Sequence, residues 1–404
     1  AVDSDSAGAR GEDKALRESY LQASNFVGRE AELAQLLTGL DRLKSDEPAH
    51  FLIAGESGVG KTRLTEEFRK HALVAGYLVL DGQAVADGHE AFHMWRPVLR
   101  RLLLQVAIDD WQASILKALV PDLPALLQRP VADAPEISGA EFLQRILLVM
   151  TDVFRQSQQP IVLILEDIHW AQDALQPLAF LLEQRDALPH LMLVASYRSD
   201  ETPKLAEQLS TMHLIELDRL NRSEIAQLSI AMLGTVGQQQ ALVDFLERET
   251  EGNTFFMVEV VRALSDAAGH LDATSIYQLP EHILTGGIQA MLQRRLGKIP
   301  ADYAVLTQLA AILGRNIDEA ILQTALPTIS VEDWLYIAEG AAVLSVQEDR
   351  WRFAHDKLRE AVLSDIDANH KTDLHHKAAQ AIEMVYADQL TEHANALLLH
   401  WQAT

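Results

Sequence analysis

The sequence predicts an α/β P-loop NTPase core built on a parallel five-stranded sheet, followed by an all-α lid domain, a winged-helix domain and the start of a helical, TPR-like array. Three observations carry this prediction: five short apolar runs, a glycine-rich loop after the first of them, and a change from strands to helices near residue 221. The domains that we expect are a linker at 1–24, the core at 25–220 with a helical insertion at about 87–157, the lid at 221–279, the winged helix at 280–366 and the helical repeats at 367–404.

The core strands are predicted from runs of residues that are almost entirely apolar. Such runs, when helical segments separate them, are typical of a parallel sheet that is buried on both faces. The interval between the second and third runs is too long for one crossover helix, and helical patterns fill it, so we expect an insertion there. The strands are predicted at residues 51–54, 77–80, 161–165, 191–196 and 213–217.

A phosphate-binding loop is predicted between the first strand and the helix that follows it. Its glycines let successive backbone N–H groups surround a phosphate, and the N-terminus of the helix adds donors and partial positive charge. Lys61 supplies a cation for the β- and γ-phosphates, and the Thr62 hydroxyl suits Mg²⁺. This is the P-loop pattern, and the nucleotide-binding residues that we expect here are Gly55, Glu56, Ser57, Gly58, Val59, Gly60, Lys61, Thr62 and Arg63.

Two carboxylates, Glu166 and Asp167, end the third predicted strand, roughly a hundred residues after the P-loop. A P-loop enzyme needs one acid to hold Mg²⁺ and another to orient the attacking water, and a strand end that faces the P-loop delivers both. An acidic strand-to-helix turn is a common alternative for such a pair. The position of Glu166-Asp167 after a P-loop favours a Walker B motif. We therefore expect Thr62 and Glu166 to hold Mg²⁺, with Asp167 beside them.

The second half of the chain is predicted to be helical, with one hairpin. Asn221 or Ser223 would cap the first helix of the lid. Residues 343–353 alternate around a polar Gln-Glu-Asp turn, which indicates a β-hairpin after several helices, as in a winged helix. Helical patterns at 371–386 and 390–401 follow and predict an antiparallel pair, although two helices do not establish a repeat.

Five motifs in a fixed order resemble the STAND branch of the AAA+-type ATPases, over roughly residues 25–365. The nearest resemblance is to ATPase modules fused to bacterial LuxR-type regulators, nucleotide cyclases and Ser/Thr kinases, with the NB-ARC proteins of apoptosis and plant immunity more distant. The motifs are Phe26-Val27-Gly28-Arg29-Glu30, the P-loop, Glu166-Asp167-Ile168-His169-Trp170-Ala171, Ala195-Ser196-Tyr197-Arg198 and Arg352-Phe353-Ala354-His355-Asp356.

The resemblance implies further site residues. Val27, Gly28 and Arg29 would border the adenine, and Arg198 would be a sensor arginine that reaches the γ-phosphate. His355 matches the histidine of the NB-ARC Met-His-Asp motif, which contacts the β-phosphate of ADP. The catalytic residues that we expect are Glu166, Asp167, Lys61 and Arg198.

Some of these residues have structural alternatives, and some depart from the family pattern. Arg198 could be a surface arginine after a strand, and His355 a structural histidine at a hairpin-to-helix junction with Asp356 as the N-cap. Thr254 stands where the family has a proline that touches the base, which puts that contact in doubt. The order Glu166-Asp167 is uncommon, and no arginine resembles an AAA+ trans finger, so we expect slow hydrolysis.

The function that these features favour is a regulatory ATP/ADP switch. ADP, held between the P-loop and the winged helix, would keep the module closed, and exchange for ATP would release it for self-association. Such a switch requires that the two conformations differ in their affinities for the two nucleotides. A fused or partner effector domain and a helical-repeat sensor would lie outside this chain.

Two other functions compete with the switch. The first is a DNA-binding transcriptional regulator of the LuxR type, with this ATPase as its regulatory module. The winged-helix segment at 330–340 carries Glu332, Asp333 and Glu339 and no basic residue, so we expect no direct contact with nucleic acid from it, and a DNA-binding domain would lie elsewhere. The second is a metabolic P-loop enzyme such as a small-molecule kinase, which would not need a lid and a winged helix.

The composition limits the partners further. The 404 residues include 34 basic and 58 acidic side chains, for a net charge of −24, which disfavours free polyanions. There is no cysteine, so disulfides and thiolate sites are excluded. Because no signal peptide or membrane-length apolar run is visible, we expect a cytoplasmic protein without a membrane partner. The chain starts without Met and stops inside a helical pattern, so we expect it to be part of a longer or processed protein.

Overall fold

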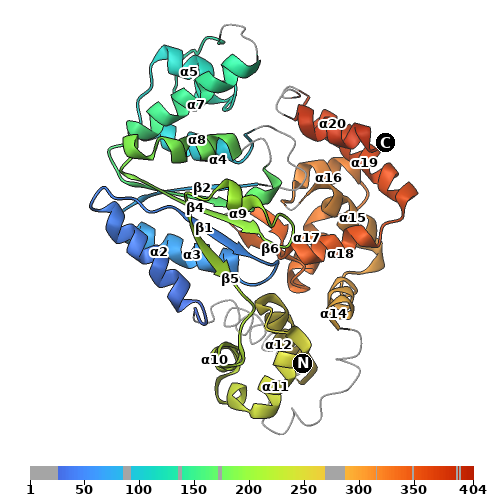
Figure 1. Ribbon diagram of the computed structural model, residues 1–404. Helices are drawn as coiled ribbons and strands as arrows, with labels where there is room; N and C mark the ends of the chain where they lie inside the picture. The colour runs from blue at the N-terminus through green and yellow to red at the C-terminus, as the bar shows by residue number, and fades with distance from the viewer. Residues whose placement is uncertain are drawn as a thin grey trace, which may run out of the picture.

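The computed structural model describes residues 26–84, 92–134, 139–171, 175–268, 287–314, 316–347, 350–387, 390 and 393–404. The predicted linker at 1–24 and the predicted boundary between lid and winged helix at 279–280 lie outside these residues. Figure 1 shows the sheet at the centre of the molecule, the lid helices α10–α12 at one end, and the C-terminal helices along one side.

Five parallel strands form the central sheet in the order β2-β3-β4-β1-β5, which confirms the predicted P-loop NTPase core. Strand β1 lies between two neighbours, and the register places Gly55 beside Arg198 of β4 and Leu217 of β5. The P-loop therefore leaves the sheet at the edge where the other strands also end. The strands are β1 (Phe51–Gly55), β2 (Leu78–Gln83), β3 (Ile161–Glu166), β4 (Leu191–Arg198) and β5 (His213–Leu217).

Helices cover both faces of this sheet, as the apolar residues of its inner strands β1, β3 and β4 require. On one face, α2 (Glu30–Leu43) and α3 (Lys61–Val74) enclose a core with alternate residues of the strands. The other face carries a larger core that includes the insertion, which is helical as predicted. Its helices are α4 (Trp95–Leu103), α5 (Asp110–Leu116), α6 (Leu123–Leu126) and α7 (Gly139–Arg155), and α8 (Leu175–Glu183) and α9 (Leu205–Gln208) follow.

The lid is a separate helical unit with its own apolar core. It consists of α10 (Arg222–Leu233), α11 (Gln240–Thr250) and α12 (Thr254–Ala268). Asn221 caps α10 as predicted: its side chain accepts from the backbone N–H groups of Ser223 and Glu224, while the Glu224 carboxylate accepts from Asn221 N–H. The cap fixes the point where the core ends and the lid begins.

The next unit, here called the helix–hairpin unit, has helices followed by an antiparallel hairpin around one core. Asn316 makes an isolated antiparallel bridge to Arg352, which pairs a third segment of the chain with the hairpin. This is the arrangement on which the winged-helix prediction depends, and the assignment to that class stays a prediction. The elements are α14 (Gly287–Leu296), α15 (Ala304–Leu313), α16 (Glu319–Ala325), α17 (Val331–Gly340), β6 (Leu344–Gln347), β7 (Arg350–Phe353) and α18 (Asp356–Ser364).

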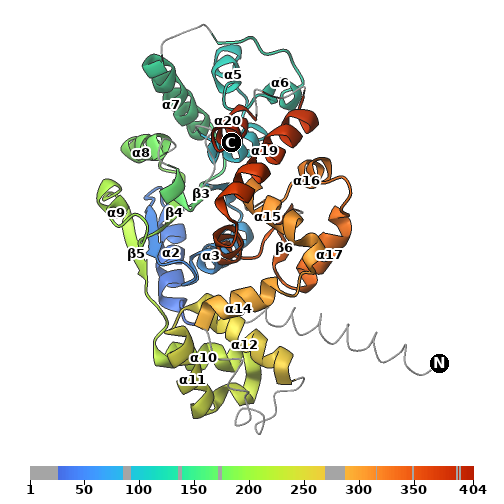
Figure 2. The same cartoon turned by 90° about the vertical axis from the view of Figure 1, so that its right-hand side faces the viewer.

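The chain ends in two antiparallel helices, α19 (Ala368–Val385) and α20 (Ala394–Gln402), as the sequence predicts. Near their connection Tyr386 stacks on His393, and further along the pair His375 Nδ1, in the middle of α19, lies 2.9 Å from His400 Nδ1. Figure 2 shows this pair beside α15 and α16. Whether the pair begins a repeat stays a prediction. Throughout the described residues, no helix combines the length and apolarity needed to cross a membrane.

Candidate nucleotide-binding site

The P-loop has the conformation that phosphate binding requires. Gly58 and Gly60 adopt φ values of +87° and +105°, where other residues would be strained, and Gly60 immediately precedes α3. Lys61 is buried, and its ammonium donates to the carbonyl oxygens of Gly55 (2.7 Å) and Glu56 (2.8 Å). Burial lowers the pKa of Lys61 to about 8, against the opposing effect of Asp167. At neutral pH a charged ammonium therefore lies folded over the loop, where a phosphate can replace these carbonyls.

The two predicted Walker B carboxylates lie at the end of β3, in different surroundings. Glu166 Oε1 accepts from the hydroxyl of Thr65 on α3 at 2.5 Å, which ties the strand to the P-loop helix. Asp167 is buried in a left-handed backbone conformation (φ +56°), and its carboxylate accepts from Gln83 Nε2 at 3.0 Å. Thr62 and Glu166 line one cavity, so the two predicted Mg²⁺ ligands lie on a common surface. Their hydroxyl and carboxylate oxygens are the kind of ligand that Mg²⁺ prefers.

A cavity of about 520 Å³ lies over the P-loop, and core, lid and helix–hairpin unit all line it. It brings together most of the predicted site residues from three separate parts of the chain. Those that line it are Val27, Arg29, Ser57, Gly58, Val59, Gly60, Lys61, Thr62, Arg63, Asp167, Arg198, Thr254 and His355. Gly28, Gly55 and Glu56 adjoin these residues in the chain, and Glu166 lines the neighbouring cavity.

Arg29 lines the cavity but also braces the P-loop. Its side chain is buried, and Nη2 donates to the carbonyl oxygens of Val59 and Asp218, the latter just beyond β5, while Nη1 pairs with Glu32 at 3.2 Å. These contacts give Arg29 a structural role that sequence reasoning did not assign. Contact of Val27, Gly28 or Arg29 with an adenine stays a prediction.

The start of α12 is attached to the P-loop by three hydrogen bonds. Asn253 Nδ2 donates to Ser57 O at 2.9 Å, Thr254 Oγ1 donates to Val59 O at 3.3 Å, and Phe255 N–H donates to the carbonyl of Gly58 at 2.9 Å. Thr254, where the family has a proline, therefore contacts the P-loop directly. The sequence prediction omitted Asn253 and Phe255, although the Gly-Asn pair next to Thr254 was a signal for this segment.

The candidate sensor Arg198 lies at the end of β4, and its guanidinium is engaged by carboxylates. Nη2 donates to Asp356 Oδ2 and Nη1 to Glu201 Oε1, both at 2.6 Å, and Glu360 lies 3.4 Å from Nη1. Burial lowers the pKa of Arg198, but Asp356 and Glu201 raise it by more, so the net shift is upward. The guanidinium also lies 4.8 Å from the centre of the Trp170 ring. Because Asp356 and Glu360 belong to α18, this arginine links the core to the helix–hairpin unit.

His355 lies at the junction between β7 and α18, over the lid. Its Nδ1 accepts from Lys357 N–H at 3.1 Å, which makes His355 the N-cap of α18. Its ring stacks on that of Phe255, with centroids 3.7 Å apart and planes at 20°. The structural alternative with Asp356 as the N-cap is wrong in that detail: an imidazole nitrogen of His355 caps the helix, and Asp356 pairs with Arg198.

The AAA ATPase domain family matches residues 25–194, which contain both nucleotide motifs. Among curated proteins, no sequence matches the chain. Among solved structures, the chain is similar to a Signal Transduction ATPase with Numerous Domains (STAND) protein with a tetratricopeptide repeat sensor from Pyrococcus horikoshii. That match has a TM-score of 0.52 and 11% identity, over 89% of this chain and 45% of that one. The chain thus spans less than half the length of that protein.

A second match is Cdc6p from Pyrobaculum aerophilum, with a TM-score of 0.44, 13% identity and coverage of 86% of this chain and 97% of that one. At 11% identity the Pyrococcus horikoshii structure shows a shared fold and no more, while the family match concerns the type of domain. Residues 25–194 therefore match the AAA ATPase domain family, and the chain shares the P-loop ATPase fold of the STAND protein from Pyrococcus horikoshii.

Proposed function

We propose that this chain is an ATP/ADP-dependent signalling switch. In this proposal, Mg-ATP or ADP binds over the P-loop, hydrolysis is slow, and the nucleotide controls whether the helix–hairpin unit stays against the core. Release of that unit would permit self-association and regulate a fused or partner effector. The coupling requires that the closed arrangement differs from the open one in its affinity for ADP relative to ATP.

The observation that supports this proposal is the contact of Arg198 with Asp356. Arg198, which we propose as the γ-phosphate sensor, has only 4% of its surface exposed, and it pairs with a carboxylate from another unit. A γ-phosphate and Asp356 are both anions that suit the same guanidinium. Binding of ATP would therefore compete with the contact that closes the molecule, whereas ADP, which lacks that phosphate, would leave it in place.

The alternative of a DNA-binding regulator receives no support from the helix–hairpin unit. Helix α17 presents Glu332, Asp333 and Glu339 to solvent, and these would face phosphates across a groove. The proposed switch could still regulate a DNA-binding effector outside this chain, because the helix–hairpin unit does not specify the effector.

The variant Asp356→Asn tests the proposed switch. It removes the competing charge but keeps the size of the side chain, so we expect the affinity for ATP to rise about five- to 150-fold relative to that for ADP. Calorimetric titration of both nucleotides gives this ratio, and light scattering with each nucleotide gives the degree of self-association. Glu383→Gln on α19, which does not line the cavity, is a control for the loss of one carboxylate. An unchanged ratio in Asp356→Asn would refute the competition.

A further inference from the structure

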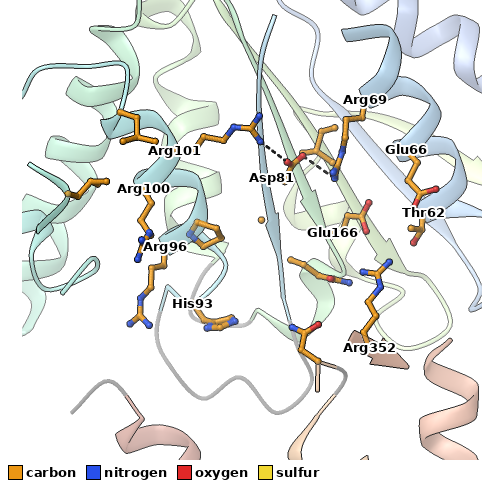
Figure 3. Close-up of a pocket in the computed structure, with 17 residues that line it drawn as sticks. Thr62, Glu66, Arg69, Asp81, His93, Arg96, Arg100, Arg101, Glu166 and Arg352 are labelled. Atoms are coloured by element: carbon orange, nitrogen blue, oxygen red, sulfur yellow. Dashed lines mark hydrogen bonds and ion pairs between the residues drawn. The ribbon is translucent and has the colours of Figure 1, made fainter. Parts of the chain in front are cut away.

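A second cavity, of about 800 Å³, adjoins the nucleotide cavity. Helix α3, the edge strand β2, the insertion helix α4 and strand β7 of the helix–hairpin unit contribute to its walls (Figure 3). Thr62, Glu66 and Arg352 line both cavities, so the two meet at the first turn of the P-loop helix. A volume of this size is in the range of small-molecule sites.

The lining of this second cavity is basic, in contrast to the chain as a whole. Five arginines and a histidine face three carboxylates, so the side chains leave two positive charges when the histidine is neutral, whereas the net charge of the chain is −24. The charged and titratable lining residues are Arg69, Arg96, Arg100, Arg101, Arg352, His93, Glu66, Asp81 and Glu166.

Some of these arginines also make structural contacts. Arg69 and Arg101 both pair with Asp81, at 3.0 and 3.5 Å, so that one carboxylate serves two guanidinium groups. Arg100 pairs with Asp122, and Arg96 Nε donates to Leu119 O at 3.0 Å. A guanidinium has five N–H donors in a planar fork, so an arginine in an ion pair can also donate to a second anion. The ion pairs hold the arginines in position, and the lining still has more positive than negative charge.

We propose that this second cavity, here called the anion cavity, binds a small molecule that carries two or more phosphate groups. The planar fork of an arginine suits phosphate oxygens, and the arginines come from three elements: α3, α4 and β7. Figure 3 shows Arg96 and Arg100 on one wall and Arg352 on another, with Asp81 between them. A ligand with an anionic group at each wall would therefore bind more tightly than a ligand with a single anionic group. Through Arg352, such a ligand would connect the insertion to the helix–hairpin unit.

Calorimetric titration with inorganic pyrophosphate tests the anion cavity. The full chain is first saturated with Mg-ADP at constant free Mg²⁺, so that the P-loop is occupied. We expect one pyrophosphate to bind per chain, with orthophosphate weaker, and the double variant Arg96→Ala/Arg100→Ala to bind it at least about tenfold more weakly. The control Arg155→Ala/Arg248→Ala removes the same charge from α7 and α11, outside the cavity, and should bind as the wild type does. Melting temperatures show that each variant is folded.

Three results would overturn the proposal. The first is that pyrophosphate fails to bind the ADP-saturated wild type, and the second is that both double variants bind it equally. The third is that a single-stranded oligonucleotide binds more tightly than pyrophosphate and depends on Arg96 and Arg100, since that would assign the surface to nucleic acid. Lys61→Ala without nucleotide separates this proposal from the switch: pyrophosphate binding that persists while ADP binding is lost supports the anion cavity independently.

Discussion

At the scale of single residues, Lys61 shows that the P-loop holds a buried positive charge in the absence of nucleotide. Its ammonium is buried and makes hydrogen bonds to two carbonyl oxygens of its own loop. Neutral carbonyls offset only part of the cost of burying a charge, which is why the pKa falls to about 8. A phosphate would offset this cost much better, so the buried ammonium of Lys61 strongly favours the binding of an anion.

The first prediction is that Lys61→Ala abolishes or severely weakens binding of ATP and ADP, for which we expect micromolar or tighter affinity in the wild type. Calorimetry with Mg-ATP and with ADP measures both affinities. Lys70→Ala on the same helix, where the lysine pairs with Glu67 on the surface, is the matched control and should bind as the wild type does. Equal affinities of wild type and Lys61→Ala would contradict the assigned role.

The second prediction concerns His50, which is buried next to β4. Burial, with smaller effects of Arg185 and His213, lowers the pKa of His50 to about 4. Its Nδ1 accepts from Leu193 N–H at 3.2 Å, and protonation of that nitrogen would break the bond. Between pH 6.5 and 4 the unfolded chain binds the proton and the folded chain does not, so folding stability falls as the pH falls, by up to about 3 kcal/mol.

Unfolding by urea at a series of pH values measures this effect of His50. The variant His50→Asn keeps an acceptor for Leu193 N–H but does not titrate, so its stability should fall less than that of the wild type between pH 6.5 and 4. Parallel curves for the two proteins would show that acid sensitivity arises elsewhere.

The sequence is sufficient to position a residue whose motif lies within one local segment. It is less informative about a residue whose partner is distant in the sequence. The P-loop and Glu166-Asp167 depend on one strand and the turn after it, so their spacing is sufficient. The contact of Arg198 with Asp356 spans 158 positions and depends on how two units dock, which no local pattern encodes. The hydrogen bond from Arg29 to Val59 was missed for the same reason.

At the scale of elements, the start of α18 combines capping with contacts to two other units. His355 caps the helix and stacks on Phe255 of α12, while Asp356 reaches the end of β4. The sequence predicts the hairpin and the helix after it, because the polar turn and the junction are local signals. It does not predict the cap, since histidine is not a usual N-cap residue. The seven-residue helix α16 was also not delimited, because so short a segment has little periodicity.

The third prediction separates the two roles of His355. His355→Ala should lower the free energy of unfolding by about 1 kcal/mol through the lost cap, and His355→Asn, with a good capping side chain, should recover most of that loss. If the ring also donates to the β-phosphate of ADP, both variants should weaken ADP about five- to 150-fold more than ATP. Melting temperatures and calorimetric affinities for both variants provide the comparison. An unchanged ADP/ATP ratio in both would make His355 a structural residue only.

At the scale of the whole molecule, three units surround one nucleotide cavity, and the sheet order fixes where they meet. The five-stranded core could be predicted because its inner strands β1, β3 and β4 are mostly apolar and the edge strands β2 and β5 still contain short apolar runs. That the helix–hairpin unit closes the cavity could not be predicted. The closure depends on ion pairs between two surfaces, and no sequence pattern marks either surface as a contact. The same holds for the anion cavity, whose arginines lie on three separate elements.

The fourth prediction is that this chain hydrolyses ATP slowly, at about one turnover per minute or less. The reason is that no trans arginine is evident in the sequence and that Arg198 is held by carboxylates in the structure. A steady-state phosphate-release assay at saturating Mg-ATP measures the rate, with Lys61→Ala as the blank for contaminating ATPases. A Lys61-dependent rate above about one per second would indicate a working ATPase rather than a switch.

The three hydrogen bonds between the P-loop and the Asn253–Phe255 segment have a consequence for the timing of nucleotide exchange. A lid attached in this way moves together with the loop and does not lift from the phosphates on its own. His355 and Asp356 of the helix–hairpin unit line the same cavity, and Asp356 is held to the core by Arg198. Within the proposed switch, we therefore expect the lifetime of bound ADP to depend on how often α18 detaches from β4, that is, on the ion pair between Arg198 and Asp356.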